Sequence, residues 1–179
     1  MTLSIGEIKT GQDFEEWFFL RRSKGIKNLP YEQFEAGYAE AKRSQGEDWD
    51  PLNPKSFGAA RLLWGVKEGI RSVTKESNPA AAIYRLVDTR FDYFHGADGS
   101  VEYDGERIFF DITINRYKPV RNTVGDRIMI ITHQHAWEGK ITMIGYYIGL
   151  MLLQKKIHRN LRRDASALFQ NEDSGMLMT

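Results

Sequence analysis

The Asp104-Gly105 dipeptide constrains the fold of this chain more than any other local feature. It interrupts residues 91–115, where the hydrophobic period is near two and aromatic and β-branched residues predominate. An Asp-Gly pair between two such runs is a strong signal for a β-hairpin. If these two residues form the turn, each residue before them faces one at the same distance after them, so that Glu102 faces Arg107.

Alternation along the hairpin divides its side chains between two faces. The first face is apolar and is expected to lie on the core: Ala97, Gly99, Val101, Tyr103, Ile108, Phe110, Ile112 and Ile114. The second face is mostly polar: Asp98, Ser100, Glu102, Arg107, Phe109, Asp111, Thr113 and Asn115. The Glu102–Arg107 pair is expected to be an exposed ion pair that contributes little to stability.

The same register predicts that Asp98 lies directly opposite Asp111, with Cβ atoms about 5 Å apart. Two like charges at that distance repel by about 3 kcal/mol at an effective dielectric constant near 20. A shared proton, a neighbouring Lys or Arg, or a divalent cation would offset this repulsion. The alternative is that both acids are hydrated on a solvated face and have no function.

The remaining patterns predict helices flanking a small mixed sheet, an α/β (α+β) fold with the hairpin at its centre. Helices are expected over residues 12–22, 31–43, 57–75, 80–88 and 138–168, and a further strand over residues 127–135. Residues 45–54 contain two prolines and several acids, and are expected to form a linker or an exposed loop. The predicted organisation is an N-terminal helical extension, residues 1–50, followed by an α/β domain, residues 51–179.

Composition excludes several classes of protein. The absence of cysteine excludes disulfide scaffolds, thiolate metal sites and cysteine nucleophiles. With 25 basic and 24 acidic residues, the chain has no global field that would require a nucleic-acid or membrane partner. The first residues lack the pattern of a signal peptide, and the longest apolar stretch, residues 141–153, is too short to span a bilayer. A cytoplasmic protein without a membrane partner is therefore expected.

The segment GADGSVEYDGERIFFDIT resembles the core motif of the PD-(D/E)XK metal-dependent nucleases, whose fold is restriction-endonuclease-like. Asp98 matches the first acid of that motif and Asp111 the second. The resemblance implies that both acids hold Mg²⁺ or Mn²⁺, which polarises a phosphodiester of DNA and activates a water molecule. An acid on the preceding helix often assists in this family, and by position it would be Glu68 or Glu76.

The motif departs from the family at two positions. Thr113 stands where the family has a lysine that activates water, and Ala97 stands where it has proline. In an active enzyme Thr113 would position water, and the missing charge would come from Lys118, Lys67 or Lys140. Alternatively, catalysis is lost and the chain is a nucleic-acid-binding or assembly module on the same fold. A third interpretation is a protein-interaction domain that uses the aromatic N-terminal helices.

Two further groups of residues carry chemistry that suits phosphate. His133 and His135 share one face of a strand end and are candidates for auxiliary metal or acid–base roles, or are simply solvated. Four basic residues near the end of the last helix would contact a nucleic-acid backbone, or would be a solvated helix terminus: Lys155, Arg159, Arg162 and Arg163. DNA is favoured over RNA as the partner. A homodimer fits an enzyme that cuts two strands.

Overall fold

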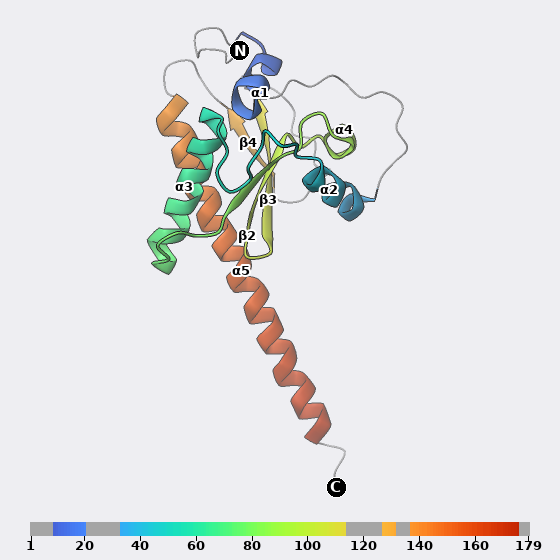
Figure 1. Cartoon of the computed structure of the whole chain (residues 1–179). Helices are drawn as coiled ribbons and strands as arrows, with labels where there is room; N and C mark the ends of the chain where they lie inside the picture. The colour runs from blue at the N-terminus through green and yellow to red at the C-terminus, as the bar shows by residue number, and fades with distance from the viewer. Residues whose placement is uncertain (1–8, 21–32, 114–126, 132–136, 176–179) are drawn as a thin grey trace.

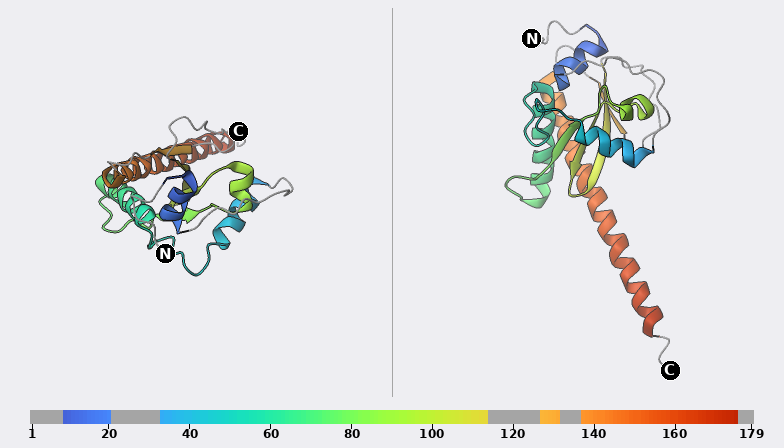
Figure 2. Two further views of the ribbon diagram at one scale, coloured as in Figure 1. Left: turned by 90° about the horizontal axis from the view of Figure 1, so that it is seen from above. Right: turned by 45° about the vertical axis from the view of Figure 1, so that its right-hand side comes forward.

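The computed structural model describes residues 9–20, 33–113, 127–131 and 137–175. These residues form a mixed α+β fold in which helices cover both faces of a sheet (Figures 1 and 2). The helices are α1 (Gly11–Phe19), α2 (Phe34–Arg43), α3 (Phe57–Thr74), α4 (Arg90–His95) and α5 (Trp137–Gly175). The strands are β1 (Ala82–Arg85), β2 (Gly99–Tyr103), β3 (Glu106–Thr113) and β4 (Arg127–Ile131). The expected α+β class is confirmed.

The sheet has the order β1-β2-β3-β4, with β1, β2 and β3 antiparallel and β4 parallel to β3. The predicted hairpin register is confirmed from Gly99, which pairs with Phe110, to Glu102, which pairs with Arg107. The turn residues Asp104 and Gly105 have φ values of 51° and 77°. Positive φ at both positions is what a two-residue turn of type I′ requires, and the Asp-Gly pair tolerates it.

Two elements differ from the sequence prediction. Residues 82–85 form β1 instead of the helix expected over residues 80–88. The hairpin strand begins at Gly99 rather than at Phe91, because residues 90–95 form α4. Thr89 caps this helix by accepting a hydrogen bond from the Asp92 N–H. A run such as AAAIYR suits either a buried helix or a buried strand, and tertiary pairing with β2 decides between them.

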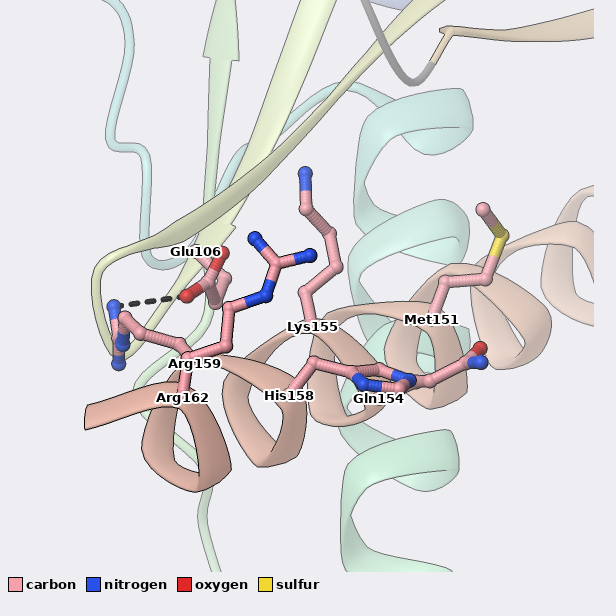
Figure 3. Close-up of a pocket in the computed structure, with 7 residues that line it drawn as sticks. All are labelled: Glu106, Met151, Gln154, Lys155, His158, Arg159 and Arg162. Carbon is pink, nitrogen blue, oxygen red and sulfur yellow. Dashed lines mark ion pairs between the residues drawn. The ribbon is translucent and has the colours of Figure 1, made fainter. Parts of the chain in front are cut away.

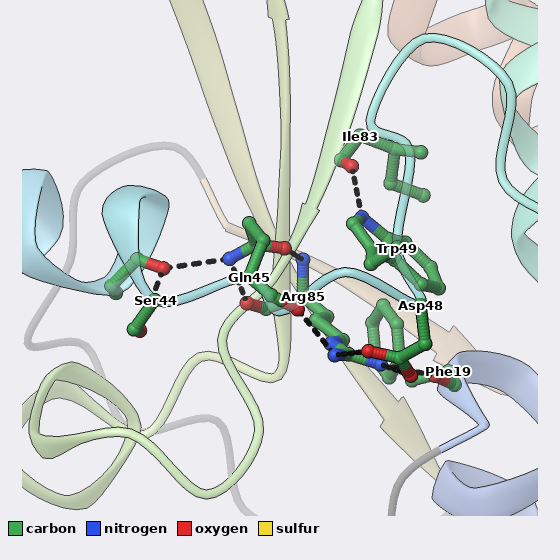
Figure 4. Close-up of polar contacts among 8 residues, drawn as sticks. Phe19, Ser44, Gln45, Asp48, Trp49, Ile83 and Arg85 are labelled. Atoms are coloured by element: carbon green, nitrogen blue, oxygen red, sulfur yellow. Dashed lines mark hydrogen bonds and ion pairs between the residues drawn. The ribbon is translucent and has the colours of Figure 1, made fainter.

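The segment of residues 45–51 covers the open edge of β1 and is not a linker (Figure 4). The Gln45 side-chain amide accepts from the Arg85 N–H at 3.0 Å and donates to the Arg85 carbonyl at 2.9 Å, so it replaces a neighbouring strand. Trp49 Nε1 donates to the Ile83 carbonyl, and the Ile83 N–H donates to the Pro51 carbonyl. Because these edge groups are satisfied, the edge strand offers little to a pairing partner.

The guanidinium of Arg85 is buried and ties three segments together (Figure 4). It forms a two-pronged ion pair with Asp48, at 2.7 and 2.9 Å, and donates to the carbonyls of Gln45 and Phe19. A guanidinium in a buried position needs this number of acceptors, since its charge cannot be removed by deprotonation. Arg85 therefore joins the end of α1 and the β1-edge segment to the sheet.

One large apolar core lies between the sheet and the helices α1, α3 and α5. It contains the predicted core residues of the hairpin from Val101 to Ile112, and the aromatic residues of α1 join it. Phe18 and Phe19 of α1 both lie about 6 Å from the ring of Phe110. A smaller cluster lies on the opposite face of the sheet, under α2 and α4. The boundary expected between residues 50 and 51 falls within the segment that covers β1.

Helices α3 and α5 approach one another through four glycines. An added Cβ on Gly65 or Gly69 would lie 2.2 Å from a backbone carbonyl oxygen of α5, and one on Gly145 would lie 2.2 Å from the Leu62 oxygen of α3. An added Cβ on Gly149 would lie 2.4 Å from the Val66 oxygen of α3. The contact is therefore backbone against backbone, and neither helix can move aside without disturbing the other.

Helix α5 has 39 residues, and at 1.5 Å per residue it is about 58 Å long. Its first half packs on α3 and the sheet, whereas its second half extends beyond them (Figure 1). Within the described part of the chain, no helix combines the length and apolar character needed to cross a membrane.

We expect Gly145→Ala to lower the free energy of unfolding by about 2 kcal/mol, because the new methyl group would collide with backbone atoms that have no rotamer to change. The matched control is Gly139→Ala on the same helix, where an added Cβ meets nothing within 4 Å. That control should be neutral or stabilising by up to about 1 kcal/mol, since alanine is the better helix former. Urea denaturation of both variants measures the difference, and equal effects would contradict the close packing.

Candidate functional site

Asp98 and Asp111 lie at the end of the hairpin opposite its turn. Asp111 is in β3, and Asp98 immediately precedes β2. Both are buried, with exposed fractions of 5% and 1%. The ladder pairs end at Gly99 and Phe110, and the Asp98 N–H donates to the Phe110 carbonyl at 3.1 Å. The expected direct pairing of Asp98 with Asp111 is therefore wrong, because the backbone slips by one residue at this point.

Asp98 is held by hydrogen bonds to two neighbouring strands. Its carbonyl accepts from the N–H groups of Leu86 and Val87, at 2.8 and 3.1 Å, just beyond β1. Its carboxylate oxygen Oδ2 accepts from the Ile112 N–H at 2.7 Å. The side chain thus supplies the acceptor that a longer β2 would have supplied, and it brings the carboxylate next to Asp111 in β3.

The two acids do not lie on a solvated face, which contradicts the alternative of two hydrated side chains. Alternation along β3 places Asp111 on the same face as Phe109. Phe109 is enclosed by rings of α2 and α4, with ring centroids 5.1 Å from Tyr38, 5.4 Å from Phe91 and 5.5 Å from Phe34. The second hairpin face is therefore a second core, in which the buried Ser100 lies opposite Phe109 and hydrogen-bonds the Tyr38 hydroxyl.

Thr113 is buried and is the last residue of β3. It pairs with Ile131, the last residue of the parallel strand β4. Both strands therefore end on the same side as the acid pair. Lys118, His133 and His135 lie outside the described residues.

The acids expected on the preceding helix have other partners in the structure. Glu68 forms an ion pair with Arg71, one turn further along α3. Glu76 accepts a hydrogen bond from the Tyr103 hydroxyl at 2.6 Å, and burial together with this carboxylate raises the pKa of Tyr103 to about 12. Tyr103 is five strand residues, about 17 Å, from Asp98, so Glu76 lies towards the opposite end of the hairpin.

Two of the three lysines expected to replace the motif lysine, Lys67 and Lys140, lie within the described residues. Lys67 Nζ donates to the Leu52 carbonyl at 3.3 Å, and Lys140 is exposed near the start of α5. Within residues 9–20, 33–113, 127–131 and 137–175, no group of three or more His, Asp or Glu side chains is arranged to hold a metal ion.

The basic end of α5 lines a groove of about 720 Å³ beside the hairpin turn (Figure 3). Lys155 Nζ donates to the Arg107 carbonyl at 2.9 Å, and Arg159 pairs with Glu106 at 2.9 Å. Arg162 also lines the groove, and Arg163 is exposed on the same part of the helix. Alternation places Glu106 on the face of β3 opposite to Asp111, so this groove and the acid pair lie on opposite faces of the sheet.

Part of the basic helix end has a structural role. Lys156 forms an ion pair with the turn residue Asp104 at 2.6 Å, and this contact lowers the pKa of the Asp104 carboxyl. Arg159 also donates to the Asp104 carbonyl at 2.9 Å. These contacts fasten the hairpin turn to α5. They therefore account for some of the basic residues without a nucleic-acid partner.

The sequence prediction missed the polar surface beside α2. Glu102 and Arg107 face one another in the ladder, as predicted, but each takes a partner from α2. Glu102 pairs with Lys42 at 2.6 Å, and Arg107 forms a two-pronged ion pair with Glu35. Tyr38 and Lys42 are four residues apart on a predicted helix, so they lie on the same helix face. This spacing was the signal in the sequence for a polar surface on α2.

Comparison of the chain with models of protein families, with curated proteins and with solved structures finds no match.

We expect Asp98→Ala to lower the free energy of unfolding by about 2 kcal/mol, because the buried Ile112 N–H would lose its acceptor. Asp98→Asn keeps an oxygen acceptor and should cost about half as much or less. Thermal or urea unfolding of both variants measures this difference. If alanine and asparagine cost the same, the bond to Ile112 does not stabilise the fold.

The stability of the protein should decrease as the pH falls below 6.5, because His95 is buried between Phe34 and Phe91. Burial lowers the pKa of His95 below its ordinary value of 6.5. The unfolded chain then binds a proton that the folded chain does not bind until a lower pH. Folding stability from His95 is complete above about pH 6.5 and is lost as the pH falls through the folded pKa, by at most about 1.4 kcal/mol per pH unit.

The measurement is the free energy of unfolding against pH for the wild type, His95→Phe and His158→Gln. His95→Phe should flatten the curve between neutral and mildly acidic pH. His158 is exposed on α5, so its variant should follow the wild type. Parallel curves for all three proteins would contradict a role for His95.

Proposed function

We propose that this protein hydrolyses phosphodiester bonds in DNA with Mg²⁺ or Mn²⁺ held at Asp98 and Asp111. The observation that carries the proposal is the burial of two carboxylates at one end of the sheet, where Asp98 bonds the backbone N–H of the residue that follows Asp111. Buried carboxylates need compensating positive charge or hydrogen bonds, and a divalent cation is an effective source of that charge. The mixed sheet with a central hairpin and flanking helices also supports the proposal, since the resemblance implies a small mixed sheet flanked by helices.

The donor set suits Mg²⁺. This ion is usually held by one or two carboxylates and completes its octahedron with water and substrate phosphate oxygens. Asp98, whose Oδ2 accepts from the Ile112 N–H, and Asp111 would contribute the two carboxylates. When bound, the ion would polarise the scissile phosphate and lower the pKa of a water molecule.

The protein residues around the acid pair have defined tasks in this proposal. The hydrogen bond from Ile112 fixes the orientation of the Asp98 carboxylate, so that the donor atoms need not reorganise when substrate arrives. Thr113, on the same face of β3 as Asp111, offers a hydroxyl that can position the attacking water. Its neutral side chain cannot supply the positive charge of the family lysine, and Lys118 is the proposed substitute.

A catalytically silent nucleic-acid-binding or assembly module is the second candidate. Two observations favour it: Thr113 occupies the position of the family lysine, and Asp98 already has a structural role through Ile112. The groove beside the basic end of α5 would then be a contact for the phosphate backbone.

The decisive experiment is a cleavage assay on plasmid DNA, single-stranded DNA and RNA, with Mn²⁺, with Mg²⁺ and with EDTA. We expect cutting of DNA with either metal and none with EDTA. Asp111→Asn should reduce the rate by at least about a hundredfold, because it removes a charge from the metal site. Calorimetric titration with Mn²⁺ should show a parallel loss of metal affinity in this variant.

Asp104→Asn is the matched control, since Asp104 is an exposed acid on the same hairpin. It should cut at the rate of the wild type. A folded wild-type protein that binds Mn²⁺ nowhere and cuts no substrate would overturn the enzyme proposal. Salt-sensitive binding of nucleic acid by that same protein would support the silent module instead.

A further inference from the structure

A second groove, separate from the basic end of α5, lies between α2 and the strands β1 and β3. Its volume is about 470 Å³. It is lined by Glu35, Tyr38, Ala39, Lys42, Arg43, Tyr84 and Arg107. The strand register places Tyr84 beside Ser100 and Ser100 beside Phe109, so this groove opens on the same sheet face as Asp111.

The cations of the groove are held against aromatic rings. Lys42 Nζ lies 4.6 Å from the ring centroid of Tyr84 and 5.5 Å from that of Tyr38. The guanidinium carbon of Arg107 lies 4.9 Å from the Tyr38 centroid and 5.2 Å from that of Phe34. These contacts, together with the Lys42–Glu102 ion pair, fix both cations in place. The positive charges are therefore arranged before any ligand arrives.

The guanidinium of Arg107 is paired with the Glu35 carboxylate, which a ligand can displace. Both guanidinium nitrogens bond the Glu35 oxygens, which is the geometry that arginine uses for carboxylates and phosphates alike. The Glu35 side chain is 72% exposed, so the ion pair is a weak surface interaction. A phosphate group can replace Glu35 on Arg107 at little cost.

Tyr84 supplies the other half of a nucleotide site. Its ring is half-buried at the groove wall, one residue position along β1 from the covered edge residue Ile83. Aromatic rings at a groove lined by basic residues are the usual platform for bases of single strands, because every base has a face that can stack. Tyr38, in contrast, is buried, and its hydroxyl bonds Ser100 and Glu102.

We propose that this groove binds a nucleoside phosphate unit, free or within a single strand of nucleic acid. The base packs against the ring of Tyr84 and the Lys42 side chain that lies over it, and the phosphate takes the place of Glu35 on Arg107, with Arg43 alongside. Arg107 and Asp111 are four residues apart on one face of β3, about 13 Å. Where the proposed function holds, the groove is the part of the enzyme that holds the strand beside the acid pair. The choice of a nucleic-acid ligand rests on that function.

The test is fluorescence anisotropy of a labelled single strand of DNA, measured in EDTA so that no cutting occurs. Unlabelled nucleoside monophosphate, single-stranded RNA and duplex DNA serve as competitors, and they distinguish a free nucleotide site from a strand site. Tyr84→Ala should weaken binding by about tenfold, and Tyr84→Phe should restore it. Glu35→Gln should tighten binding by about threefold, because it removes the competitor on Arg107.

The matched controls change the same chemistry elsewhere. Tyr93→Ala removes an exposed tyrosine of α4, and Glu40→Gln removes a carboxylate of α2 that does not line the groove. Both should bind as the wild type does. Equal tightening in Glu35→Gln and Glu40→Gln would show an effect of net charge only and would overturn the proposal. Wild-type affinity in Tyr84→Ala would also overturn the proposal. Binding that depends on Arg162, in the groove at the basic end of α5, would overturn it as well.

Measuring both binding and cutting distinguishes failure of the groove proposal from failure of the proposed hydrolysis. A strand bound through Tyr84 by a protein that cuts nothing supports the groove and overturns the proposed hydrolysis. Cutting that is unaffected by Tyr84→Ala and Glu35→Gln overturns the groove and leaves the hydrolysis in place. No binding of any competitor or labelled strand in EDTA overturns the groove.

Discussion

The bond between the Asp98 carboxylate and the Ile112 N–H holds together the end of the sheet on which the candidate site depends. Through its backbone, Asp98 also fixes the residues that follow β1. A carboxylate that accepts a buried N–H is orientated before any ligand binds, which is the condition for efficient metal or phosphate chemistry. The same bond makes Asp98 a structural residue, so its presence alone does not separate an active enzyme from an inactive relative of the same fold.

The basic side chains on the two faces of the sheet have different partners. On the α5 face, Lys156 and Arg159 hold the acidic hairpin turn, so part of the basic character of the helix is used for packing. On the α2 face, Lys42 and Arg107 are held by aromatic rings, and Arg107 meets an exposed carboxylate. Asp111 belongs to the α2 face. The proposed path of a nucleic-acid strand, from the groove beside α2 to Asp111, therefore stays on one side of the sheet.

The hairpin could be predicted from sequence because its determinants are local. Asp104 and Gly105 set the turn, and a two-residue turn sets the register of every pair that follows. Helix α3 was predicted for the same reason, from the periodicity of residues 57–75. Residues 80–88 were assigned wrongly because a short apolar run has no local preference, and the groups that make residues 82–85 a strand belong to β2, Gln45 and Pro51.

Part of the geometry around Asp98 and Asp111 could be predicted for a similar reason. The hairpin register brings Asp98 and Asp111 to the same end of the sheet, with a slip of one residue at Asp98, whose N–H donates to the Phe110 carbonyl. The partners of Arg107 could not be read from the hairpin, because two candidates compete for it. Glu102 is its neighbour across the ladder, whereas Glu35 approaches from α2 and accepts one hydrogen bond on each oxygen from the two terminal nitrogens of Arg107. The geometry of a planar fork favours the second, and Lys42 then takes Glu102. Arg107 is therefore paired with Glu35, whose side chain is exposed. The proposed phosphate site depends on this exposure, because the phosphate must displace Glu35 from Arg107.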